Sequence, residues 1–132
     1  MSELHIIRVS LMRILYFLTF ITLVTWWPRL FSHDGTWDPL TGVGISFYAV
    51  ASILALVGIA YPIQMIPLLL IQLLYKATWV LFVGLPITSS GAESAFAEEL
   101  MIANSVGVVI DLLVIPWFFV FKKYFGLPKL KP

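Results

Sequence analysis

The chain contains no cysteine and only two histidines, His5 and His33, among its 132 residues. Without cysteine it has no disulfide, no thiol redox chemistry and no thiolate metal site. A haem held between two buried histidines is not expected either. The G-x-S-x-G, H-E-x-x-H and glycine-rich phosphate-loop patterns of familiar catalytic sites are also missing. We therefore expect no metal and no cofactor, and an enzymatic function is not favoured.

Charged residues are scarce as well. They make up 11% of the chain, whereas hydrophobic residues make up 61% and aromatic residues 15%. In soluble domains the charged share approaches a quarter. With a mean hydropathy of +1.00, the chain is predicted to be a polytopic membrane protein with room for four spans of ~20 residues. The net charge is only +1 and the basic residues collect near the chain ends, so the partner is the lipid bilayer and not nucleic acid.

Four apolar stretches predict the membrane spans, at residues 6–26, 43–61, 63–87 and 100–121. The third carries one charge, Lys76, and at ~1.5 Å per residue it is long enough to cross a ~30 Å hydrocarbon core. The second and third spans meet at Tyr61 and Pro62 in a tight hairpin. Polar segments are expected between and after the spans, at residues 27–42, 88–99 and 122–132. The fold class is thus all-α, a transmembrane four-helix bundle forming a single membrane domain over residues 1–132.

Lysine and arginine are unevenly distributed about these spans. Arg8 and Arg13 lie near the start of the chain, whereas Arg29 lies alone on the other side. Four lysines follow the last span: Lys122, Lys123, Lys129 and Lys131. Since cytoplasmic segments carry the excess of Lys and Arg, both termini are predicted to be cytoplasmic. We expect a multi-pass membrane protein.

Two charged residues lie deep inside the predicted spans. Asp111 follows Leu100 by 11 residues and Lys76 precedes Ile87 by 11 residues, so each lies roughly 16 Å below the outer boundary. Because their spans are adjacent and antiparallel, we expect the two side chains to meet near the midplane. Further polar or aromatic residues on these two helices complete the candidate site: Gln72, Tyr75, Trp79 and Asn104. On the fourth span Asn104, Gly107 and Asp111 recur at helical spacing and form one stripe.

Ionisable residues inside a membrane usually mark ligand sites, ion paths or proton relays. The alternative is a structural ion pair that fixes the register of two helices. Gln72, Asn104 and Tyr75 supply more polar groups than one ion pair requires, which favours the functional interpretation. From the first span, Arg13 and Tyr16 are candidates to join the cluster, although Arg13 equally suits a side chain that snorkels to the cytoplasmic headgroups.

Three functions are open at this point. The first is a buried Lys/Asp site that binds a small lipophilic ligand or relays a proton or small ion. The second is a non-catalytic accessory subunit of a larger membrane complex, and the third is a small membrane enzyme acting on a lipid or isoprenoid, with Asp111 as base. A stripe of small residues on the second span, Ala51, Ala55 and Gly58, offers a packing surface for another helix and hence for a homo-oligomer.

The layout resembles the DoxX-like group of small bacterial four-helix inner-membrane proteins. The similar features are the arginines that open the first span, Arg8 and Arg13, and the tight second-to-third hairpin, ASILALVGIAYPIQMIPLLLIQLLYKATW. This chain departs from the group at Tyr61-Pro62, where a charged turn is common, and its Lys76 and Asp111 match no site of the group. The resemblance implies the four-helix fold, a location in the bacterial inner membrane and an accessory or small-ligand role, often near redox systems.

Overall fold

A computed structural model describes residues 3–91 and 94–126. All regular structure in these residues is helical, which confirms the all-α class. In chain order the helices are α1 (Glu3–Leu23), α2 (Trp26–Ser32), α3 (Pro39–Ala60), α4 (Ile66–Trp79), the π-helical turn η1 (Val80–Gly84), α5 (Leu85–Ser89), α6 (Ala95–Val114) and α7 (Trp117–Tyr124). Lys129 and Lys131, which contributed to the predicted orientation, lie outside the described residues.

Several of these helices are long and apolar enough to cross a membrane. Among the described residues, three segments qualify alone: His5–Ser32, Pro39–Ala60 and Ile66–Ser89. A fourth arises if α6 and α7, which are bent by 77° relative to each other, count as one broken span. The apolar composition and these lengths indicate a membrane protein.

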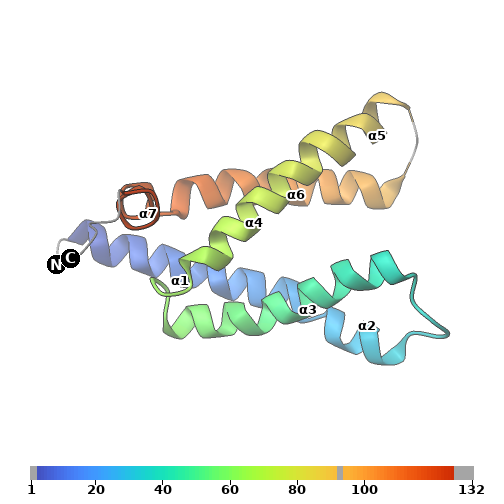
Figure 1. Cartoon of the computed structure of the whole chain (residues 1–132), viewed down its shortest axis with the longest axis horizontal. Coiled ribbons are helices and arrows are strands. Elements are labelled where there is room, and N and C mark those ends of the chain that lie inside the picture. Colours follow the sequence, from blue (N-terminus) through green and yellow to red (C-terminus); the bar gives the residue numbers. More distant parts are fainter. Residues whose placement is uncertain (1–2, 92–93, 127–132) are drawn as a thin grey trace, which may run out of the picture.

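The long helices form two pairs (Figure 1). Helix α1 packs along α3, and α4 packs along α6. The pairs approach each other at the end where α1 begins and α7 lies, and they diverge toward the end that carries α2 and α5. At the closed end the Tyr16 hydroxyl donates to the Pro62 carbonyl at 2.8 Å, which ties α1 to the turn between the pairs.

Small residues of α3 allow α1 to approach it closely. A methyl group added at Gly58 would lie 2.5 Å from the nearest ring atom of Tyr16, and Tyr16 is itself fully buried. Ala51 and Ala55 are buried in the same apolar core. The small-residue stripe predicted to receive another helix is therefore covered by α1 of the same chain and is not left free for a second copy.

The first predicted span, 6–26, needs correction at its outer end. Helix α1 ends at Leu23, and after a turn the chain resumes as α2, within the segment predicted to be a loop. The indole N–H of Trp27 donates to the Ala49 carbonyl at 2.9 Å and holds α2 against α3. A helix of seven residues is too short to show a hydrophobic period, so it could not be predicted from the sequence pattern.

Helix α3 begins at Pro39, before the predicted start at Val43. The Asp38 carboxylate accepts from the Thr41 backbone N–H at 3.0 Å and caps the new first turn. Pro39 stands at the first helical position, where its missing N–H is not needed. The non-helical part of the predicted outer loop is therefore reduced to residues 33–38.

The third span, predicted at 63–87, corresponds to a continuous helical segment from Ile66 to Ser89. Its outer part contains the π turn η1, in which the Leu85 N–H bonds to the Val80 carbonyl five residues back. The widened turn directly precedes Pro86. In a regular helix the proline ring would collide with the carbonyl four residues before it, and the extra residue in the turn relieves this.

The fourth span, predicted at 100–121, differs most from the structure. Helix α6 begins at Ala95, where the Ser94 hydroxyl accepts from the Ala97 N–H at 3.2 Å, and it ends at Val114. The chain then turns by 77° into α7. The sequence predicted a kink at this place, and the structure has a complete break.

Pro116 accounts for the break, because it disfavours helical backbone in the preceding residue. Ile115 accordingly has extended backbone, with φ −60° and ψ 128°. The Leu112 carbonyl, to which Pro116 cannot donate, accepts instead from the Trp117 indole N–H at 2.8 Å. The Ile115 carbonyl accepts from the Arg8 guanidinium at 3.0 Å. Both carbonyls thus have donors, and α1 helps to stabilise the bend.

Candidate functional site

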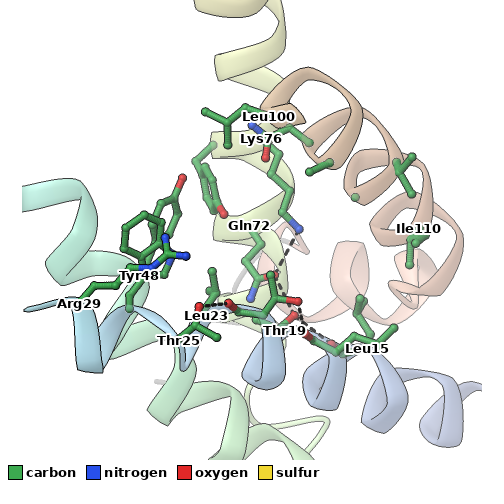
Figure 2. A pocket seen from close by; sticks show the side chains of 18 residues that line it. Leu15, Thr19, Leu23, Thr25, Arg29, Tyr48, Gln72, Lys76, Leu100 and Ile110 are labelled. Atoms are coloured by element: carbon green, nitrogen blue, oxygen red, sulfur yellow. Dashed lines mark hydrogen bonds between the residues drawn. The ribbon is translucent and has the colours of Figure 1, made fainter. Parts of the chain in front are cut away.

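A cavity of about 440 Å³ lies between the two helix pairs. Figure 2 shows its lining side chains, which come from α1, α2, α4 and α6, with Tyr48 from α3. The surface that they present to the cavity is mostly apolar, and its large apolar side chains are Leu15, Leu18, Leu23, Trp26, Leu100, Val106 and Ile110. The size is within the ~300–1,000 Å³ typical of small-molecule sites. The divergence of the two pairs therefore leaves room for a ligand.

Lys76 and Asp111 meet beside this cavity. The Lys76 Nζ lies 3.5 Å from Asp111 Oδ2, and the Asp111 side chain is fully buried while that of Lys76 is 15% exposed. Only Lys76 lines the cavity. The other carboxylate oxygen, Oδ1, has no hydrogen-bond partner among the described residues. Because strong charge-assisted bonds are ~2.7–2.9 Å long, the pair leaves both groups with unused hydrogen-bonding capacity.

Two further polar side chains extend the pair toward α1. Lys76 Nζ lies 3.5 Å from Gln72 Oε1, and that oxygen accepts from the Thr19 hydroxyl at 3.2 Å. The Thr19 hydroxyl is also 2.9 Å from the Leu15 carbonyl, so its single hydrogen serves one acceptor at a time. Gln72 is buried, and its Nε2 has no partner among the described residues. This polar network connects the two helix pairs across the cavity.

Helix α6 supplies the space in which Lys76 lies. A Cβ built on Gly107 would be 2.9 Å from the lysine Nζ and 3.0 Å from its Cδ. Asn104, one turn away, is buried and lines the same wall of the cavity. The predicted stripe of Asn104, Gly107 and Asp111 therefore does face the lysine-bearing helix.

Arg29 also lines the cavity, although the sequence placed it only in an outer loop. Its guanidinium lies 4.5 Å above the Trp26 ring, and Trp26 stacks on Tyr48 with 5.8 Å between ring centroids. In Figure 2 the side chains of Arg29 and Tyr48 lie together on the side of the cavity opposite Ile110. Helix α2 brings Arg29 back over the cavity, and no sequence signal marked that helix.

Trp79, predicted to shape the site, does not line this cavity. It packs over Gly84, where an added Cβ would lie 2.7 Å from its ring and 2.6 Å from Met101 Sδ. Three residues beyond Lys76, Trp79 lies only about 60° from it around the helix, but its ring is directed to Gly84 and not into the cavity. Tyr75 does line the cavity, and it also borders an outer groove that Trp79 shares.

Arg13 and Tyr16 are likewise separate from the polar network. Arg13 is exposed and lines a second cavity with Tyr61 and Gln64, at the closed end of the molecule. Tyr16 is fully buried against Gly58 and serves the packing of α1 on α3. Neither residue lines the cavity between the helix pairs, and of the predicted roles for Arg13 the snorkelling side chain fits its position.

Within the described part of the chain, no group of three or more His, Asp or Glu side chains is placed to hold a metal ion. The loop residues that resemble metal ligands have structural contacts. His33 stacks on Trp37 with 3.6 Å between ring centroids, and Asp38 caps α3.

Comparison with family models, with curated proteins and with solved structures finds no match to this chain. The resemblance to the DoxX-like group is therefore still a prediction. What the chain does has to be inferred from the cavity and the residues that line it.

Proposed function

We propose that the chain is a multi-pass protein of the bacterial inner membrane that binds a small lipophilic ligand in the cavity between its helix pairs. One observation carries this proposal. Lys76 and Gln72 lie in a mostly apolar cavity wall, and the buried Gln72 Nε2 lacks a partner among the described residues. Buried polar groups are nearly always hydrogen-bonded, because desolvation without a partner is costly. A ligand with acceptor atoms would offset that cost.

The form of the ion pair supports binding over a purely structural role. A pair that only fixes helix register would be expected to satisfy both charges by short bonds within the interface. Here the N···O distance is 3.5 Å and Lys76 keeps contact with the cavity. The network also continues through Gln72 to Thr19 on the other helix pair, so a ligand at this position would contact both halves of the molecule.

The membrane arrangement that we propose is a four-helix bundle with both termini in the cytoplasm. Helix α6 alone, with 20 residues, is ~30 Å long and forms the fourth span, while α7 lies outside it. The closed end of the molecule carries Arg8 and Arg13, and α7 has Lys122 and Lys123 in its last turn. Its exposed phenylalanines beside these lysines fit an amphipathic helix at the membrane surface.

Native mass spectrometry of the protein released from mild detergent tests the binding function. We expect a small molecule retained at one per chain by the wild type and lost in Lys76→Met. The double variant Lys76→Met/Asp111→Asn, which leaves no unpaired carboxylate, guards against a misfolded single variant. Lys123→Met is the matched control, since Lys123 lies on α7 beside Phe119 and far from the lining residues in sequence.

Equal retention by the wild type and both Lys76 variants would contradict the role of Lys76. A wild-type chain that carries nothing would contradict the binding function. If such an empty protein also forms a discrete homo-oligomer and passes protons in liposomes, the relay of a proton would become the better interpretation of the Lys76 and Asp111 pair.

A further inference from the structure

Among the described residues, the charges on the cavity wall are all of one sign. Of these residues two cationic ones line the cavity, Lys76 from α4 and Arg29 from α2, and no acidic one does. Asp111 balances Lys76 from behind, outside the set of lining residues. Because Asp111 offsets Lys76, the net positive formal charge that a ligand meets comes from Arg29, whose side chain is exposed.

Arg29 is available to a ligand. The one ion pair found in the described residues joins Lys76 to Asp111 and does not involve Arg29. Its guanidinium instead lies 4.5 Å above the Trp26 ring, which in turn is stacked on Tyr48. Such an aromatic platform fixes the orientation of a guanidinium while leaving its N–H donors free, and the fork of donors matches a carboxylate or phosphate.

The remaining walls suit a lipophilic body. Leu18 of α1 and Val106 of α6 line the cavity, yet they are 43% and 53% exposed. The cavity therefore opens sideways between α1 and α6, which in a bilayer would be toward the hydrocarbon. A molecule with an apolar tail can enter along this route and place its polar head among the cations.

We propose that this cavity selects an amphiphilic anion, with a carboxylate or phosphate head held by Lys76 and Arg29. The lipophilic body lies against the leucines of α1 and the facing residues of α6. This assignment rests on the proposed binding function and adds the chemical class of its ligand. A neutral or cationic amphiphile would leave the exposed Arg29 guanidinium, which has no carboxylate partner among the described residues, without an anionic head to pair with.

Calorimetric titration of the wild-type protein in phosphatidylcholine nanodiscs tests the assignment with three probes of equal chain length: decanoate, decanol and decyltrimethylammonium. We expect saturable binding of decanoate, at least tenfold tighter than that of the other two after subtraction of empty nanodiscs. Arg29→Gln should weaken decanoate binding about tenfold, through the loss of a charge-assisted hydrogen bond. Arg13→Gln makes the same chemical change at the second cavity and should leave binding unchanged.

The possible failures are distinguishable. Equal binding of all three probes would overturn the anion assignment and leave the ligand-binding function intact, whereas no saturable binding of any probe would count against both. Equal weakening by Arg29→Gln and Arg13→Gln would overturn the role of Arg29. Adding phosphatidylglycerol to the nanodiscs then separates two sources of the anion. Competition with decanoate identifies a lipid headgroup, and an unchanged affinity identifies a free amphiphile.

Discussion

Each helix pair contains a glycine at its contact, but the two glycines make room for different kinds of side chain. In the α1 and α3 pair, Gly58 lets a buried tyrosine ring lie directly on the helix backbone. In the α4 and α6 pair, Gly107 makes room for the flexible side chain of Lys76. The first contact is apolar and closed, whereas the second contains a charge that still reaches the cavity. The α1 and α3 pair is thus the tightly packed apolar half of the molecule, and the α4 and α6 pair carries the charged residues of the candidate site.

Removing the lysine has the largest expected effect on this comparison. Lys76→Met leaves Asp111, which is fully buried, without its counter-ion. Because breaking a buried ion pair from one side is strongly destabilising, we expect the free energy of unfolding to fall by about 3–5 kcal/mol. Reversible unfolding of the wild type and the variant in the same mixed micelles measures the difference.

The double variant Lys76→Met/Asp111→Asn completes the cycle. It should recover most of the lost stability, because no charge is left unpaired, but it should not recover the retained ligand. Recovery of both stability and ligand would mean that the pair is only structural, and the proposed function would then be wrong.

The close packing of α1 on α3 can be tested by adding a single methyl group. In Gly58→Ala the new Cβ meets the Tyr16 ring, which is held in place by burial and by its bond to Pro62. Overpacking of this kind costs about 1–3 kcal/mol, to be measured as the change in unfolding free energy. Gly44→Ala, on the same helix with nothing within 4 Å, is the control and should be neutral or slightly stabilising. Equal losses in both variants would show that α1 does not lie on α3 as described.

The sequence predicted the positions of residues along the helix axes better than the rotation of the helices about those axes. The length of the apolar stretches indicated the spans. The equal depth of Lys76 and Asp111 in the membrane predicted that the two side chains meet. Pro116 marked the break in the last span. These inferences depend on position along a helix axis, which counting residues gives directly.

Rotation about the axis was harder to predict, and the misplaced residues show why. Trp79 was assigned to the site because it recurs at helical spacing with Gln72 and Lys76, and Tyr16 because it lies on a face near Arg13, but each packs against another neighbour. When a helix is apolar on nearly every side, its hydrophobic periodicity does not say which side faces which partner. Arg29 was missed for a different reason, since it is placed by a short helix held through the Trp27 side chain.

The α4 and α6 pair should respond weakly to the same added methyl group. In Gly107→Ala the added Cβ meets the end of the Lys76 side chain, which can move at little cost. We expect a loss of unfolding free energy below about 1 kcal/mol, together with weaker decanoate binding because the ammonium is displaced. Unfolding and calorimetric titration of the one variant give both values. A stability loss as large as that of Gly58→Ala would contradict the contrast between the two pairs.

The smallest effect concerns how the second helix of each pair begins. The α3 cap is the titratable Asp38 carboxylate, whose pKa is lowered by the hydrogen bonds from Thr41, whereas the α6 cap is the hydroxyl of Ser94. A lowered carboxylate pKa stabilises the folded state above the unfolded value of ~3.9, and this contribution is lost as the pH falls through the folded pKa. Hydrogen exchange, corrected for intrinsic rates, should therefore show the Thr41 amide losing protection below pH ~4 while the Ala97 amide does not.

Asp38→Asn, which keeps a capping oxygen but does not titrate, should abolish the pH dependence. Equal loss of protection at the Thr41 and Ala97 amides would mean that acid opens both helix pairs by a common route. A pH dependence that persists in Asp38→Asn would mean that the Asp38 cap does not cause the loss of protection.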